Sequence, residues 1–478
     1  MLDIRDHEAL PGRAVEWRVH ADTVAAADRS GPDSRPPSHI QEAHLRAALV
    51  LRELHVDIPA WLAVTFEIAG RLDRAALETA FLRLIDRHET LRSGFRVCGE
   101  RLERFTLDAG AICIEAADGP LLGSAAEVTA HLEERFGKAT DPLAWPYYTF
   151  VVIEREKSAT VYLAFDHINI DAYSLALATY DVVELYEAAA AGRGPELPPV
   201  GSYVDFCHRE RESAGTVGDD HETVAGWRGF LNACGGRLPS FPLDLGVLHG
   251  EELPRQSSLC EWLLDAADAD AFGTACRKSG GTFLSGVLAA AGIVAREVGR
   301  QPVYRSVIPF HTRSEAQWVA SMGWYIGVAP ITVDLSGAQE FHEAVRSAED
   351  AVRAAKPMAD VPFFRVSEFL GPALSITSPD PFAFISYIDM RVAPGADSWE
   401  AWKACVIGRA SYGDQACMWI NRGHDGVYVA CRFPDTRLGR ENVPRFVRHL
   451  RRVLTATART GAYRIAPEEA AAGGCGGE

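Results

Sequence analysis

The feature that most constrains this chain is a polar nonapeptide set between two apolar runs. Residues 166–174, Asp-His-Ile-Asn-Ile-Asp-Ala-Tyr-Ser, follow a strand-like run at 161–165 and precede a helix-like run at 175–190. An imidazole, His167, and a carboxylate, Asp171, lie four residues apart in this junction. Titratable groups between two buried elements cost free energy unless they are paired or used. Because a histidine can act as a general base near neutral pH, the junction predicts a functional loop.

The junction resembles the His-His-x-x-x-Asp-Gly motif of the condensation-domain and chloramphenicol-acetyltransferase superfamily. His167 matches the second histidine and Asp171 the aspartate, whereas Asp166 replaces the first histidine and Ala172 the glycine. Further segments are similar to the family's: Pro-Ser-x-x-Gln at 37–41, Arg-His-x-x-Leu-Arg at 87–92, Trp-Arg-x-Phe-Leu at 227–231, His-Thr-Arg at 311–313 and Met-Gly-Trp-Tyr at 322–325. In detail the chain resembles the stand-alone polyketide-associated acyltransferases and condensation enzymes of actinobacteria.

This resemblance implies an α/β fold of two chloramphenicol-acetyltransferase-like lobes. Each lobe would be a mixed sheet with helices on one face, and the two would form a pseudo-dimer around a central channel. A chain of 478 residues with 47% hydrophobic content also exceeds one ordinary core. We expect an N-terminal extension at 1–36, an N-terminal lobe at 37–200, a crossover at 201–255, a C-terminal lobe at 256–465 and a disordered tail at 466–478.

Local patterns predict individual elements within these boundaries. Alternating or continuous apolar runs indicate strands at 62–68, 147–154, 159–165, 257–263, 303–309, 328–333, 382–387 and 427–433. Asp73 is placed to cap a helix whose apolar side chains share one face, and residues 283–298 form a very apolar helix expected in the core. A basic amphipathic helix is expected at 442–456, with Asn442 as its cap and Pro444 in its first turn.

The resemblance also implies a mechanism. His167 would lie in the channel and take a proton from a hydroxyl or amine acceptor, which attacks an acyl thioester without an acyl-enzyme intermediate. Asp171 would pair with an arginine and so orient the loop. Arg313 is the expected partner and Arg305 the competitor. Capping of the following helix is the alternative role of Asp171.

Other motif residues leave alternatives open. Asp166, Asp171 and Ser174 fit the Asp-x-x-x-x-Asp-x-x-Ser signature of heterocyclisation domains, which usually lack the histidine present here and accompany carrier and adenylation domains. A non-catalytic condensation-like scaffold is the alternative of a different class. Ala172 adds a methyl group beside the expected substrate path. Residues Gly323, Trp324 and Tyr325 are expected at the start of a strand or in the channel lining.

The composition of the chain limits which partners and cofactors can be expected. The net charge of −17 does not favour a nucleic acid, because phosphate binding needs a basic face. The ten cysteines show no C-x-x-C pair, and we expect neither a metal nor a cofactor. The acyl donor would be a substrate, carried on coenzyme A or on the phosphopantetheine of an acyl or peptidyl carrier protein. No signal segment and no apolar run of roughly 18 residues is present, so we expect a cytoplasmic protein without a transmembrane segment.

Overall fold

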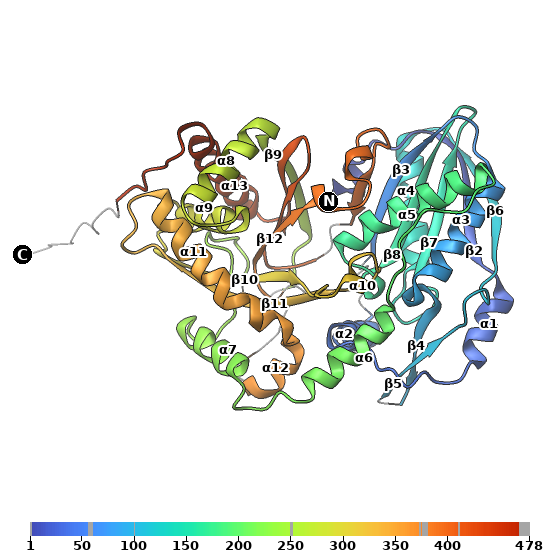
Figure 1. The fold of residues 1–478 in the computed structure, drawn as a ribbon, viewed down its shortest axis with the longest axis horizontal. Helices are drawn as coiled ribbons and strands as arrows, with labels where there is room; N and C mark the ends of the chain where they lie inside the picture. Colours follow the sequence, from blue (N-terminus) through green and yellow to red (C-terminus); the bar gives the residue numbers. More distant parts are fainter. Residues whose placement is uncertain are drawn as a thin grey trace, which may run out of the picture.

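The chain folds into two α/β lobes that lie side by side (Figure 1). The computed structural model describes residues 2–55, 61–99, 101–248, 252–371, 374, 381–409 and 412–467. Residues 468–478, most of the expected disordered tail, lie outside the described residues. The mixed α/β architecture expected from the motif resemblance is therefore present.

The N-terminal lobe is built on a seven-stranded sheet. In spatial order its strands are β1 (Leu2–Asp3), β13 (Cys405–Gly408), β3 (Trp61–Ala69), β8 (Ser158–Asp166), β7 (Tyr148–Glu154), β2 (Gly12–Val19) and β6 (Ile114–Leu122). All neighbouring pairs are antiparallel except β1 with β13. The hairpin β7–β8 ends at the polar motif, so the centre of the sheet positions His167.

Strand β8 is apolar throughout because both of its faces are covered. Val161, Leu163 and Phe165 belong to a core shared with α3 (Arg74–Arg87) and α5 (Ala172–Ala190). Tyr162 and Ala164 point to the other face, where α4 (Ala125–Ala139) packs. The expectation of helices on one face therefore holds for α3 and α5 but not for α4.

Residues 1–36 are part of this lobe and not an extension of it. Strand β2 lies inside the sheet between β7 and β6, and α1 (Ala21–Arg29) follows it. Local sequence patterns did not predict β2, because charged residues interrupt its apolar residues. Glu16 is buried, and its carboxylate bonds to Arg18 and, at 2.6 Å, to Arg135, which satisfies the charge inside the sheet.

Two further pieces complete the N-terminal lobe. Helix α2 (His39–Glu53) begins with a capping box in which Ser38 and Gln41 bond to each other's backbone N–H groups. A two-stranded ribbon joins β4 (Ser93–Cys98) to β5 (Arg101–Thr106). The α3 cap is Asp73, whose carboxylate accepts from the N–H of Ala76, as the sequence predicts.

The C-terminal lobe has a four-stranded sheet and a separate hairpin. The sheet order is β12 (Phe384–Asp389), β14 (Cys417–Arg422), β15 (Gly426–Pro434) and β9 (Gln256–Asp265), and the hairpin joins β10 (Val303–His311) to β11 (Ile326–Asp334). The helices of the core are α8 (Ala266–Lys278), α9 (Phe283–Glu297), α11 (Phe341–Ala355) and α13 (Arg437–Thr460). Helix α9 is buried from Ser285 to Ala295, which accounts for its apolar composition.

Helix α13 corrects one sequence prediction. It begins at Arg437 with Thr436 as its cap, so Asn442 is not the cap and Pro444 lies inside the helix. A proline there removes one backbone hydrogen bond. A buried apolar stripe spans the proline and holds the helix on the lobe; its members are Gly439, Val443, Phe446, Val447, Leu450, Val453 and Leu454.

Four short helices join the lobes. They are α6 (Tyr203–Ala214) and α7 (Glu222–Ala233) in the crossover, α10 (Ala316–Val319) after β10, and α12 (Phe363–Leu370), which contacts α2 and α7. Across the described ranges, no single helix meets the length and hydropathy expected of a membrane span; α8 and α9 meet them only as a pair bent by 91°.

Candidate active site

The polar nonapeptide forms a tight connection from β8 to α5. Asp166 is the last residue of β8, residues 167–169 form a single 3₁₀ turn, and α5 begins at Ala172. Asp171 caps α5 by accepting a 2.8 Å hydrogen bond from the N–H of Ser174. The alternative role of Asp171 as a helix cap is therefore real, and it coexists with the pairing described next.

Asp171 pairs with Arg313, and this pair joins the two lobes. The guanidinium nitrogens Nη1 and Nη2 donate to Oδ2 and Oδ1 at 2.6 Å and 3.1 Å. Both side chains are buried, at 3% and 4% exposure. Burial alone would raise the pKa of Asp171, but the Arg313 charge and the hydrogen bonds from Ser174 lower it. The competitor Arg305 lies on β10 and is not in this pair.

Ser174 and the segment before β11 complete this clamp, which we define as Asp171, Ser174, Arg313, Gly323 and Tyr325. Nη2 of Arg313 and the N–H of Gly323 donate to the Ser174 hydroxyl at 2.9 Å and 3.1 Å. The N–H of Tyr325 donates to Oδ2 of Asp171 at 3.1 Å. Gly323 has no room for a side chain, since a Cβ there would lie 2.3 Å from the ring of Tyr203.

His167 lies against the ring of Trp324. The two ring centroids are 4.0 Å apart and the planes are inclined by 32°. Nδ1 of His167 is buried and bonds to no other side chain in the described part of the protein. Burial lowers the pKa of His167, and the charge of the neighbouring His44 lowers it further. The charges of Asp166 and Asp171 act in the opposite direction and raise it. The imidazole is therefore neutral at pH 7, which is the form that accepts a proton.

Asp166 contacts a histidine that the sequence analysis did not identify. Oδ1 of Asp166 accepts hydrogen bonds from the N–H of Ile168 at 2.8 Å and from Nε2 of His44 at 2.9 Å. His44 is on α2, one turn after Gln41, whose side chain donates to the carbonyl of Ile168. The signal that could have revealed His44 is this spacing, because residues three apart share a helix face.

The remaining predicted residues have simpler places. Ala172 is partly buried in the first turn of α5. Gly323, Trp324 and Tyr325 directly precede β11, which agrees with the expectation that they lie at the start of a strand. Trp324 is the one whose ring contacts His167, while Tyr325 is buried against Arg313, with the guanidinium carbon 4.3 Å from its ring centroid. Lining of a channel by these residues stays a prediction.

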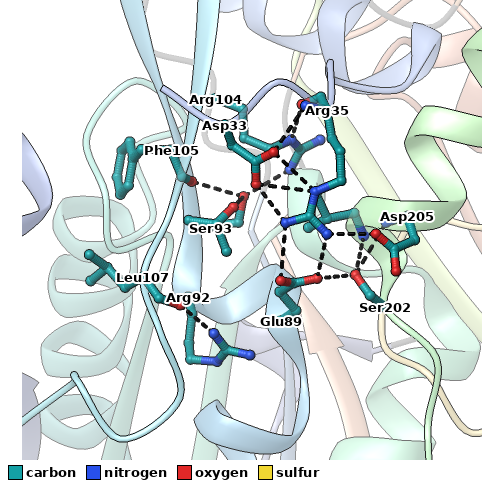
Figure 2. A network of polar contacts seen from close by, with 12 residues as sticks. Asp33, Arg35, Glu89, Arg92, Ser93, Arg104, Phe105, Leu107, Ser202 and Asp205 are labelled. Atoms are coloured by element: carbon teal, nitrogen blue, oxygen red, sulfur yellow. Dashed lines mark hydrogen bonds and ion pairs between the residues drawn. The ribbon is translucent and has the colours of Figure 1, made fainter. Parts of the chain in front are cut away.

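A second polar cluster lies in the N-terminal lobe at a distance from the motif in sequence (Figure 2). Arg35 bonds to three carboxylates: Asp33, Glu89 and, at 2.6 Å, Asp205 on α6. Burial opposes ionisation of Asp33, but Arg35 outweighs it and lowers the pKa to about 2. These bonds tie the segment before α2 to the crossover.

A cavity of about 390 Å³ lies beside the Arg35 network. It is lined by residues 31–33, 35, 89, 92 and 106–109 and does not include His167.

Comparison with known proteins identifies the family. The condensation-domain family matches residues 37–375, which span both lobes and contain the whole clamp. The chain belongs to the condensation-domain family. Its sequence is 27% identical over 460 residues to acyltransferase PapA3 of Mycobacterium tuberculosis, covering 94% of this chain and 95% of PapA3. It is 30% identical over 464 residues to trehalose-2-sulfate acyltransferase PapA2 of Mycobacterium bovis, covering 95% and 96%.

Solved structures agree with the sequence relatives. A PapA2 acyl transferase superposes with a TM-score of 0.88 at 26% identity, covering 96% of this chain and 99% of that one. The X-domain from teicoplanin biosynthesis shares the fold, with a TM-score of 0.68 at 22% identity over 91% and 97% of the two chains. The chain is thus an acyltransferase of the condensation type.

Proposed function

We propose that the protein transfers an acyl group from a thioester directly to a hydroxyl or amine, with His167 as the general base. The acceptor O–H or N–H gives its proton to the imidazole while its oxygen or nitrogen attacks the thioester carbonyl. The tetrahedral intermediate then collapses, the C–S bond breaks, and the proton passes to the leaving thiolate. An ester or amide and a free thiol result, and no bond to the enzyme forms.

The observation that carries this proposal is the state and setting of His167. Its lowered pKa keeps the ring neutral at pH 7, and Trp324 from the other lobe supports the ring face. The clamp fixes the far end of the same loop through Asp171. Since Asp171 is saturated by Arg313, Ser174 and Tyr325, it orients the loop and does not exchange protons. In this mechanism one base, worth about 10²–10⁴-fold, and substrate positioning supply most of the rate enhancement.

The acceptor that we favour is a hydroxyl. Two relatives, PapA2 and PapA1, are named as acyltransferases of trehalose derivatives, and their acceptors are therefore sugars. We propose on this basis that the product is an ester of a polyhydroxylated molecule, in lipid or secondary-metabolite biosynthesis. An amine acceptor, giving an amide, is the other outcome of the same assay.

The donor that we favour is an acyl group on a carrier protein. Although the net charge of the chain is −17, α13 presents three exposed arginines, Arg445, Arg448 and Arg451. None of the three has an ion-pair partner within the ranges that the structure describes. Carrier proteins are usually acidic, so this face has the charge that docking would need.

Thiol release measures the proposed reaction directly. Purified protein is supplied with a panel of acyl-coenzyme A and acyl-carrier thioesters, each with hydroxyl and amine acceptors, and product is identified by mass. The proposal predicts thiol release that depends on both substrates and yields an equimolar ester or amide. A non-catalytic scaffold would release no thiol with any pair.

A further inference from the structure

Asp166 is a buried carboxylate with only half of its hydrogen-bonding capacity filled. Its side chain is 0% exposed, and Oδ1 receives both hydrogen bonds described above. Oδ2 has no hydrogen-bond partner among the described residues. The bond from Ile168 alone would make Asp166 a cap of the 3₁₀ turn. A cap does not account for an imidazole brought from another helix, because the N–H of Ile168 already supplies the capping bond.

His44 reaches from Asp166 to the ring that supports His167. The His44 and Trp324 rings meet nearly at right angles, with a centroid distance of 5.5 Å and an interplanar angle of 84°. Trp324 meanwhile lies along the face of His167 at 4.0 Å. Trp324 therefore contacts both imidazoles, and Asp166 holds one of them, His44.

We propose that His44, held by Asp166, is a positioning residue for His167: it fixes the Trp324 ring on which His167 rests and places a second imidazole beside it. The proposal rests on the proposed function of His167 as general base. Nε2 of His44 lies 2.9 Å from Oδ1 of Asp166, so the buried carboxylate holds the imidazole in place.

The charged groups around the cluster come from several elements. His167 faces His44 on α2, Asp166 at the end of β8 and Asp171 at the start of α5. Arg313 from the C-terminal lobe is neutralised by Asp171. Helix α12, which packs on α2, carries Arg365 and Glu368, and these two pair with each other. The charge of His44 lowers the pKa of His167, so removing that charge raises it.

Two substitutions separate the two parts of the proposal. His44→Gln places an amide nitrogen near the position of Nε2, so it keeps the bond to Asp166 but removes the imidazole. His44→Phe keeps a ring against Trp324 but cannot bond to Asp166. His449→Gln is the matched control, because Nε2 of His449 bonds to Glu297 at 2.6 Å in the other lobe. The two histidine side chains are equally covered, at 16% exposure for His44 and 15% for His449.

Histidine NMR tests the electrostatic part without any substrate. The His167 imidazole signal is assigned by its loss in His167→Gln, and its titration midpoint is followed in each variant. We expect the midpoint to move to higher pH in His44→Gln and to stay in place in His449→Gln. An unchanged midpoint in His44→Gln overturns the proposal.

Steady-state kinetics tests the positioning part with an active donor and acceptor pair. In His44→Phe we expect kcat to fall by about tenfold to a hundredfold at nearly constant KM, since a small displacement of a base slows proton transfer. In His44→Gln we expect a smaller loss of kcat, because the side chain stays held by Asp166 beside Trp324, and we expect the acid limb of the pH profile to move to higher pH. A kcat of His44→Phe within twofold of wild type overturns the proposal.

The two readouts keep the failures apart. If His167→Ala retains turnover, the proposed function fails, whatever the NMR midpoint does. If His167→Ala is inactive but neither His44 variant changes the midpoint or kcat, the general base stands and the role of His44 is wrong. Circular dichroism melts of all variants identify any loss that comes from unfolding.

Discussion

The two carboxylates of the motif, Asp166 and Asp171, have different surroundings although both are buried. Asp171 faces a fixed cation, Arg313, and both of its carboxylate oxygens accept hydrogen bonds from the clamp. Asp166 faces an imidazole, His44, and leaves Oδ2 without a partner among the described residues. Arg313 donates to both oxygens of Asp171, whereas His44 contacts only one oxygen of Asp166.

This difference implies that the two ends of the loop have different roles. The Asp171 end is a static link between lobes, and its loss should affect both stability and turnover. The Asp166 end holds one imidazole within the same lobe, and its loss should affect turnover and the pH profile more than stability. The following variants break or sharpen that contrast, in order of decreasing effect.

The largest effects are expected at the clamp. Asp171→Asn and Arg313→Ala each leave a buried group without its partner, which costs about 3–5 kcal/mol of unfolding free energy. The loop then moves, and turnover should fall by about a hundredfold. Chemical denaturation measures the loss of stability, and thiol release measures the loss of turnover. Arg305→Ala is the control, because Arg305 lies on β10, the strand that leads to Arg313. Additive losses in the double mutant would remove Arg313 as the functional partner.

Smaller effects are expected at Asp166. Asp166→Asn keeps an oxygen for the N–H of Ile168 but loses the charge, so turnover should fall by about tenfold with little change in stability. Asp166→His should be tolerated better than His167→Asp, since the family places an imidazole at this position.

One result would favour the heterocyclisation alternative instead. If Asp166→Ala abolished turnover while His167→Ala did not, Asp166 would be the reacting group. The product assay should then look for loss of water from a Cys-, Ser- or Thr-derived product.

The clamp also predicts how stability depends on pH. The pKa of Asp171 is lowered in the folded protein, so its contribution is complete above the pKa of the unfolded chain, near 3.8. That contribution disappears as the pH falls through the lower, folded value. Unfolding free energies of wild type and Asp171→Asn should differ most at neutral pH and converge on acidification below about pH 4. A constant difference down to pH 2 would contradict the ionised pair.

The smallest effect concerns the donor. With one acyl group on both carriers, we expect kcat/KM to be several-fold higher for the carrier protein than for coenzyme A, and to fall as salt screens α13. Charge reversal of Arg445, Arg448 and Arg451 should remove this advantage and leave the coenzyme A rate unchanged. Equal or better kcat/KM with coenzyme A, without salt dependence, would favour the free coenzyme as donor.

Local sequence patterns predicted the elements that carry the motif. Strands β7 and β8, helices α3 and α5, and the pairing of Asp171 with Arg313 all follow from apolar runs, caps and the family resemblance. These features were accessible because a strand buried on both faces is apolar throughout and because helix caps use few residue types.

The remaining features depend on contacts that local patterns do not encode. Strand β13 has four residues and joins β3 across more than three hundred positions of sequence. Strand β2 carries charges whose partners, such as Arg135, come from elsewhere. His44 lies outside the motif, and only the docking of α2 on the 166–168 loop brings it to Asp166. Tertiary packing therefore decided what the sequence analysis missed.

Turnover of His167→Ala tests the central claim most directly. Thiol release and product mass are compared for wild type, His167→Ala and the control His449→Ala, at matched folding and with one active donor and acceptor pair. The account predicts a loss of at least about a hundredfold in His167→Ala and less than twofold in His449→Ala. Turnover of His167→Ala within a few-fold of wild type would show that His167 is not the base.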